Sequence, residues 1–147
     1  MEPIRVLDLF SGTGSIRKVC DSLPDIFECV SLDITAKLHV GKVEYIMDVM
    51  DFEYKEFEPG YFDIITASPS CIMYSIARTT AKTPRDILGS NLVVQRVIDI
   101  IKHLQPVVGW IENPVSLATT ECSPFRHVVI IPCNYCINST LLCFECT

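Results

Sequence analysis

The sequence lacks both a long apolar run and a basic segment at its beginning. No run reaches the ~18 apolar residues of a membrane-spanning helix, so no membrane segment is expected. The chain starts MEPIRVLDLF, which leads directly into a predicted strand and contains no secretory signal. We therefore expect an intracellular protein, cytoplasmic or, in a eukaryotic or virus-infected cell, nuclear. Its 8 cysteines are then expected to be thiols.

Positive charge is also scarce. The chain has 12 Lys and Arg against 18 Asp and Glu, a formal net charge of −6. This balance excludes a protein that binds nucleic acid over its whole surface, so any such contact must come from a local patch. A hydrophobic content of 49% excludes a disordered chain. The length of 147 residues predicts a single α/β domain, residues 1–147.

The chain opens with a strand, a glycine turn and a helix. The apolar residues 4–10 predict the strand, and helical spacing follows from Ser15 to Leu23. Gly12 and Gly14 permit a tight turn and a close approach of the backbone to a ligand, and the helix start offers free N–H groups. An ordinary turn is the alternative for this GxG pattern.

Two further strands end in a carboxylate. The strand predicted at 27–32 ends at Asp33, which follows Gly14 by 19 residues, near the ~20 of nucleotide-binding domains whose acid binds ribose hydroxyls. A strand predicted at 43–47 ends at Asp48. Asp48 is interpreted either as a ligand contact at the same edge of the sheet or as a helix N-cap.

A cysteine follows the next predicted strand. The apolar run 62–67 predicts a buried parallel strand, and the sequence ASPSC then places Cys71 in the loop at its carboxyl end. A thiol in this position can act as a nucleophile. The alternative is a small buried apolar residue, the commoner role of a free cysteine.

The segment 74–86 is the cationic loop of this acidic chain. It carries Arg78, Lys82 and Arg85 among hydroxyl residues, which predicts contacts with phosphates. The alternative is an exposed loop that happens to be basic. Apolar residues then recur at helical spacing over 87–104 and predict a helix that packs on the sheet.

A further carboxylate ends the strand predicted at 107–111. Glu112 is expected next to Cys71 at one edge of the sheet. In an apolar setting desolvation raises the pKa of a carboxyl group, so Glu112 would hold a proton to donate. An exposed acid at a strand end is the alternative.

Short strands are predicted at 128–131 and 141–144, within a cysteine-rich end. Two CxxC pairs have the internal spacing of a zinc or iron–sulfur site, but the 6 residues between the pairs are fewer than the ~15–20 of the usual pattern. We therefore predict thiols of an apolar segment and no metal. The cysteines concerned are Cys133, Cys136, Cys143 and Cys146.

Five segments, taken in order, resemble the motifs of the cytosine-C5 methyltransferases. The loop ARTTAKTPRD (77–86) is most similar to that of the small phage- and virus-type members. The five segments are DLFSGTGS (8–15), SLDI (31–34), DVMDF (48–52), FDIITASPSCIMYS (62–75) and WIENP (110–114).

This resemblance implies a Rossmann-like domain that depends on S-adenosylmethionine, with a mostly parallel α/β sheet that is incomplete at the C-terminus. It implies that Cys71 is the nucleophile and Glu112 the acid. The residues implied to bind the cofactor are Phe10, Gly12, Gly14, Asp33, Ile34, Asp48 and Pro69. Those implied to contact nucleic acid are Ser75, Arg78, Lys82 and Arg85.

The implied reaction transfers a methyl group to C5 of cytosine in DNA through a covalent Cys71 adduct. The thiolate adds at C6 of the ring, while a protonated Glu112 at N3 accepts the developing charge. Because a stacked base cannot be reached, the nucleotide is flipped out of the duplex.

The chain also departs from the family pattern. Ser70 stands where a second proline is usual, which loosens the loop that aims the thiol. After Pro114 the remaining 33 residues contain no counterpart of the later arginine motif, the target-recognition domain or the final cofactor-pocket segment. We therefore expect a truncated or minimal member, with exposed surface that favours a homodimer or a partner subunit. The alternatives are a catalytically weak regulatory subunit and an RNA cytosine-C5 methyltransferase.

Overall fold

The computed structural model describes residues 2–70, 84 and 86–112, and the backbone of residues 128–131 and 142–143. Its seven-stranded sheet has the order β3-β2-β1-β4-β5-β6-β7. All neighbouring strands are parallel except β6 and β7. The strands are β1 (Ile4–Leu9), β2 (Phe27–Asp33), β3 (Tyr45–Ile46), β4 (Ile64–Ala67), β5 (Val108–Glu112), β6 (Val128–Ile131) and β7 (Leu142–Cys143).

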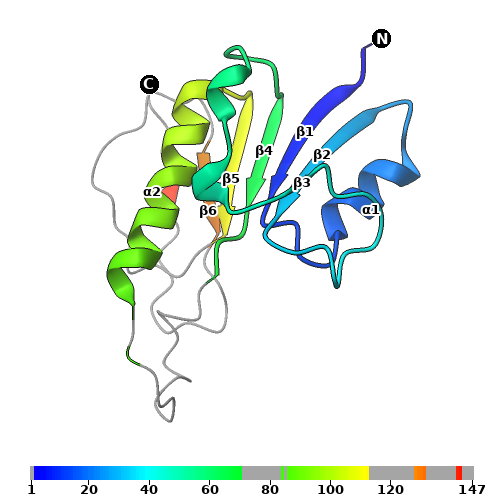
Figure 1. The fold of residues 1–147 in the computed structure, drawn as a ribbon. Coiled ribbons are helices and arrows are strands. Elements are labelled where there is room, and N and C mark those ends of the chain that lie inside the picture. Colours follow the sequence, from blue (N-terminus) through cyan, green and yellow to red (C-terminus); the bar gives the residue numbers. More distant parts are fainter. Residues whose placement is uncertain (1, 71–83, 85, 113–127, 132–141, 144–147) are drawn as a thin grey trace.

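Two α-helices lie on opposite faces of this sheet (Figure 1). They are α1 (Ser15–Ser22) and α2 (Ile87–Leu104). Side chains alternate along β1, so that Val6 packs with Cys20 of α1 while Leu7 and Leu9 pack with Val97 of α2. The Rossmann-like α/β class predicted from the sequence is therefore confirmed.

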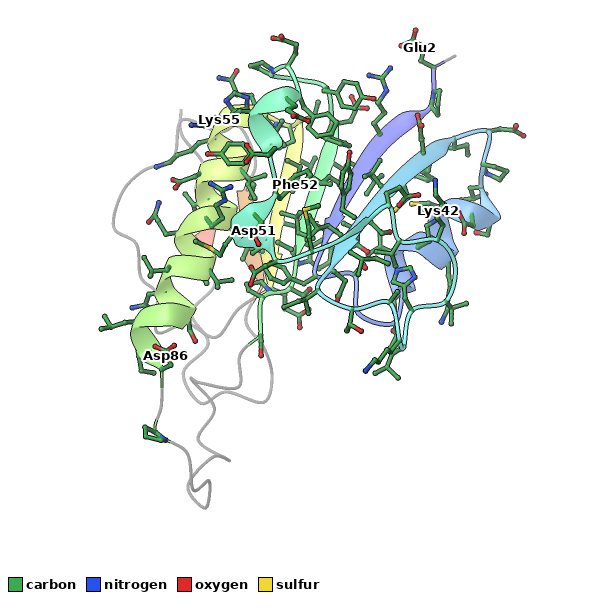
Figure 2. All side chains as sticks on the ribbon, in the orientation of Figure 1. Glu2, Lys42, Asp51, Phe52, Lys55 and Asp86 are labelled. Atoms are coloured by element: carbon green, nitrogen blue, oxygen red, sulfur yellow. The ribbon has the colours of Figure 1, made fainter. Side chains whose placement is uncertain are left out.

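The main core lies between the sheet and α2. It includes Phe52 and Phe62, both almost fully buried. Two 3-10 helices, η1 (Val49–Asp51) and η2 (Tyr54–Glu56), connect β3 to β4 beside α2 (Figure 2). Arg96 of α2 holds this connection, because its guanidinium donates to the carbonyl oxygen of Phe52 at 2.9 Å.

Both ends of helix α2 are formed by residues typical of helix ends. Asp86 caps its amino end by accepting a hydrogen bond from the Gly89 N–H at 2.8 Å. Gln105 takes a left-handed conformation (φ 46°) at the carboxyl end, and Pro106 follows. The predicted bounds of this helix are confirmed. No helix among the described residues is long and apolar enough to cross a membrane.

The third strand is shorter than predicted. It covers residues 45–46 instead of 43–47. The reason is Glu44, whose carboxylate accepts the N–H of Ser31 at 2.8 Å while its own N–H donates to the Ser31 carbonyl at 3.1 Å. If β3 began earlier, one of its backbone carbonyls would accept the N–H of Ser31 in β2. The Glu44 side chain accepts that N–H instead, so the strand pairing begins only at Tyr45.

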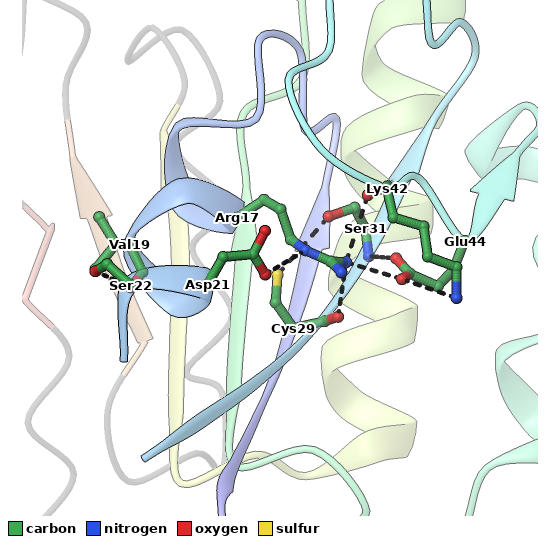
Figure 3. A network of polar contacts seen from close by, with 8 residues as sticks. All are labelled: Arg17, Val19, Asp21, Ser22, Cys29, Ser31, Lys42 and Glu44. Carbon is green, nitrogen blue, oxygen red and sulfur yellow. Dashed lines mark hydrogen bonds and ion pairs between the residues drawn. The ribbon is translucent and has the colours of Figure 1, made fainter. Parts of the chain in front are cut away.

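Arg17 of α1 links this corner of the fold (Figure 3). Its guanidinium donates to Asp21 at 2.8 Å, to Glu44 at 2.8 Å and to the carbonyl of Cys29 at 3.1 Å. Burial alone would raise the pKa of Glu44, but the hydrogen bonds from Ser31 and Arg17 outweigh it and lower the pKa. The network ties α1, β2 and the segment before β3 together.

Candidate active site

A cavity of about 310 Å³ opens at the carboxyl edge of the parallel strands. Small-molecule sites are commonly apolar clefts of this kind with a few polar groups, and α/β sheets form them at this edge. One wall follows the ends of strands β1 to β4, and the other is the first part of α2. The lining residues are Phe10, Leu32, Asp33, Ile34, Met47, Asp48, Val49, Pro69, Ser70, Asp86, Gly89, Ser90 and Val93.

The structure brings five of the seven predicted cofactor residues to this one cavity. They come from four different strand ends, which are distant in sequence but adjacent in the sheet. The five are Phe10, Asp33, Ile34, Asp48 and Pro69.

The two glycines of the turn do not line the cavity. Gly12 instead donates its N–H to a carboxylate oxygen of Asp33 at 2.8 Å. Gly14 has φ 76°, and a Cβ built on it would lie 2.6 Å from the Val40 carbonyl oxygen and 2.8 Å from the His39 ring. The close approach expected to a ligand at Gly14 is therefore an approach of the chain's own loop.

Asp33 is nearly buried, with 8% of its surface exposed. One carboxylate oxygen accepts from Gly12, and the other accepts from the N–H of Thr35 at 3.0 Å. Each carboxylate oxygen has two lone pairs, so Asp33 retains acceptor capacity for ligand hydroxyl groups. The same side chain thus shapes the glycine turn and faces the cavity.

Asp48 fits both interpretations made from the sequence. It caps η1, because its side chain accepts from the N–H of Met50 at 2.9 Å. It also lines the cavity. One oxygen serves the cap, so the second is free of this contact and can accept from a ligand.

The wall formed by α2 was missed from the sequence. Asp86, Gly89, Ser90 and Val93 contribute to it. The signal was present in the topology, because a helix that follows a parallel strand returns along the sheet and begins near the strand's carboxyl edge. Asp86 adds a third carboxylate to the lining, beside Asp33 and Asp48.

Glu112 ends β5 and is exposed, so the apolar setting expected for it is wrong. The alternation of β5 explains this, since Ile111 is buried in the core beneath α2 and its neighbours Trp110 and Glu112 point away from it. Glu112 contacts the end of the adjacent strand, where the Ser68 hydroxyl donates to its Oε2 at 3.4 Å.

The predicted nucleophile and the cationic residues of the loop 74–86 lie outside the described residues. Ser70, just before the predicted nucleophile, and Asp86, the last residue of that loop, both line the cavity. The described residues hold no group of three or more His, Cys, Asp or Glu that is suited to a metal ion. Outside the described residues are Cys71, Ser75, Arg78, Lys82 and Arg85, together with Cys133, Cys136, Cys146 and the side chain of Cys143.

A second polar cluster lies behind the glycine turn. The Asp8 carboxylate accepts from the Thr66 hydroxyl at 2.8 Å, and burial raises the pKa of Asp8. Its other oxygen, the Ser11 hydroxyl and both ring nitrogens of His39 are buried without a hydrogen-bond partner among the described residues.

The chain was compared with known proteins. A probable DNA (cytosine-5)-methyltransferase of Frog virus 3 (isolate Goorha) is 31% identical over 144 residues, which cover 90% of this chain and 64% of the relative. The chain thus spans slightly less than two thirds of that protein. No protein-family model matches the sequence. No solved structure matches it either.

Proposed function

We propose that the chain is a member of the family of DNA (cytosine-5)-methyltransferases and that it transfers a methyl group to C5 of cytosine in DNA through a covalent adduct of Cys71. The observation that carries this proposal is the meeting of Phe10, Asp33 and Asp48 in the wall of one cavity. These residues come from three motifs that resemble those of the family.

The lining of the cavity suits S-adenosylmethionine. Phe10 offers a ring face for the adenine, and Asp33 offers carboxylate oxygens for the ribose hydroxyls. Asp48 offers an acceptor for the adenine amino group. When bound, the cofactor supplies an activated methyl group on its sulfonium.

The residues of the chain supply the other steps. Cys71 as a thiolate forms a bond to C6 of cytosine, and Glu112 delivers a proton to N3, which neutralises the charge that develops on the ring. C5 becomes nucleophilic and takes the methyl group. A base from solvent then takes the C5 proton, which restores the C5–C6 double bond and expels the Cys71 thiolate, while N3 returns its proton to Glu112.

The position of Glu112 supports this assignment. Glu112 ends β5, which is parallel to β4, and β4 leads through Ser68, Pro69 and Ser70 directly to Cys71. Ser70 lines the cavity, so the residue bonded to Cys71 is already beside the proposed cofactor site.

DNA is the proposed substrate, and the loop 74–86 is its proposed contact. Arg78, Lys82 and Arg85 would hold phosphates while the target nucleotide is flipped out of the stack, with Ser75 nearby in the sequence. An acidic chain needs such a local patch because its surface as a whole repels phosphate.

A second candidate is a cofactor-binding subunit that works only with a partner or with a second copy of itself. The exposure of Trp110 favours it, since 42% of this residue is exposed on a central strand of a parallel sheet. Parallel sheets are normally covered on both faces.

Methyl transfer from labelled cofactor tests the proposal. The purified chain is incubated with duplex DNA, with transfer RNA and without nucleic acid, beside Cys71→Ala as the matched control. We expect label in DNA with the wild-type chain alone. Label only in transfer RNA would identify an RNA methyltransferase, and cofactor binding without any transfer would favour the partner-dependent subunit.

A further inference from the structure

Ser68 and Glu112 connect the ends of two neighbouring strands. The Ser68 hydroxyl donates to Oε2 of Glu112 at 3.4 Å. Strands β4 and β5 are parallel with Ala67 opposite Ile111, so Ser68 and Glu112 occupy the next position of this register. Their side chains therefore project from the same edge of the sheet on the same side.

The two partners differ in how firmly the fold holds them. Ser68 follows the buried Ala67, and its N–H donates to the Leu9 carbonyl at 3.4 Å. Glu112 has a long side chain at an exposed position, and no Lys, Arg or His of the described residues forms an ion pair with it. The sheet thus holds the backbone of Ser68 in place, whereas the long side chain of Glu112 is the partner that needs orienting.

We propose that Ser68 is a positioning residue that holds the carboxyl group of Glu112 toward the target cytosine. This inference rests on the proposed function, in which Glu112 donates a proton to N3. By occupying Oε2, the Ser68 hydroxyl leaves Oε1 as the oxygen that carries the proton. A protonated carboxyl group keeps acceptor capacity on its other oxygen, so the contact persists in both protonation states.

The length of the contact agrees with this role. Hydrogen bonds between oxygens are usually about 2.7–2.8 Å long, and catalytic contacts are often longer before the substrate is bound. A long contact between exposed groups contributes little to folding, so replacing Ser68 should leave the fold intact. Ser68 is also absent from the cavity wall, so cofactor binding should survive its replacement.

A double-mutant cycle tests the inference. The rate of covalent adduct formation with 5-fluorocytosine DNA and S-adenosylmethionine is measured for the wild-type chain, Ser68→Ala, Glu112→Gln and the double variant. Ser68→Ala should slow the reaction roughly 10- to 100-fold, as a small misplacement of a catalytic group does. In the Glu112→Gln background the same change should have no further effect, because the proton donor is already lost.

The conservative variant separates the hydroxyl from the shape of the residue. Ser68→Thr keeps the hydroxyl and should recover most of the rate. A purely structural role of Ser68 would instead slow adduct formation equally with Glu112 and with Gln at that position, which would overturn the inference. A wild-type rate in Ser68→Ala would overturn it as well.

A second measurement does not depend on activity. The carbon-13 shift of the Glu112 carboxyl group at pH 8 should change in Ser68→Ala and remain near the wild-type value in Ser68→Thr. An unchanged shift in Ser68→Ala would mean that the contact is not formed, and the inference would fail. Failure of the proposed function has a different signature, namely no adduct with the wild-type chain.

Discussion

The carboxylate of Asp33 accepts the N–H of Gly12 at 2.8 Å, which joins the end of β2 to the turn that follows β1. The same carboxylate lines the cavity proposed for S-adenosylmethionine. The shape of the turn and the binding of the ligand therefore depend on one side chain.

Replacing Asp33 should change both properties. Asp33→Ala should lower the melting temperature of the free chain, because it removes the hydrogen bonds that the carboxylate accepts from the N–H groups of Gly12 and Thr35, each worth about 0.5–1.5 kcal/mol. It should also reduce the rise in melting temperature caused by S-adenosylmethionine or its demethylated product. Asp48→Ala is the control, since it removes a cavity carboxylate that does not touch the turn. An undiminished ligand shift in both variants would argue against this cavity as the cofactor site.

Gly14→Ala should destabilise the chain more than Gly60→Ala. Both glycines have positive φ, 76° and 80°, which costs a side chain roughly 1–2 kcal/mol. A Cβ at Gly14 would also meet Val40 and His39, whereas at Gly60 nothing lies within 4 Å. Urea unfolding of the two variants measures the loss of stability in each. Because both share the cost of a positive φ, the difference between them reports the steric clash at Gly14. Equal midpoints would mean that the loop near Gly14 can move aside without cost.

The Arg17–Glu44 network should make stability depend on pH. The pKa of Glu44 is lowered in the folded chain, so its stabilisation is present above the ordinary value of 4.5 and is lost as the pH falls through the folded pKa. Glu44→Gln should therefore be less stable than wild type at pH 7, by about 1–2 kcal/mol. The difference should shrink at pH 3 to 4. A stability difference between wild type and Glu44→Gln that does not change with pH would show that the packing of this side chain, and not its charge, stabilises the contact between α1, β2 and the segment before β3.

Binding of DNA should depend on the cationic loop. Arg78→Ala and Arg85→Ala should each weaken binding to a similar degree across duplex sequences and should reduce its salt dependence, because each removes one proposed phosphate contact. Lys55→Ala is the matched control, since Lys55 lies at the opposite end of the molecule from Asp86 (Figure 2). Strong discrimination between unrelated duplexes would reveal a recognition element not foreseen from the sequence.

The two CxxC pairs give a prediction about metal content. Protein purified without chelator should carry zinc well below one equivalent, as measured by elemental analysis. The short separation of the pairs does not suit the usual four-cysteine site. One equivalent of zinc, with unfolding on its removal, would instead make residues 133–146 a structural metal module.

Much of the fold followed from local patterns in the sequence. Apolar runs predicted β1, β2, β4 and β5, and the spacing of apolar residues predicted α2 with its bounds. The carboxylates Asp33 and Asp48 were predicted to lie at one edge because parallel strands end together, and they share a cavity. These features depend on the spacing of apolar residues and on the order of the strands along the chain, and both can be read from the sequence.

Other features depended on contacts between distant segments. The side chain of Glu44 shortens β3 only because it meets Ser31, 13 residues away. Gly14 must lack a side chain because His39 and Val40 fold back on it. Such contacts cannot be predicted from a local sequence pattern. The position of a loop is set by its packing against distant segments, because loops have no hydrophobic periodicity of their own.

Trp110 is the one tryptophan of the sequence, and it stands two residues before Glu112 on an exposed side of β5. Its fluorescence is therefore an intrinsic reporter of a single place, next to the proposed proton donor. A nucleic acid, a second copy of the chain or a partner subunit that covers this side would remove water from the indole and shift its emission to shorter wavelength. Association at this face can thus be followed in solution without attaching a dye.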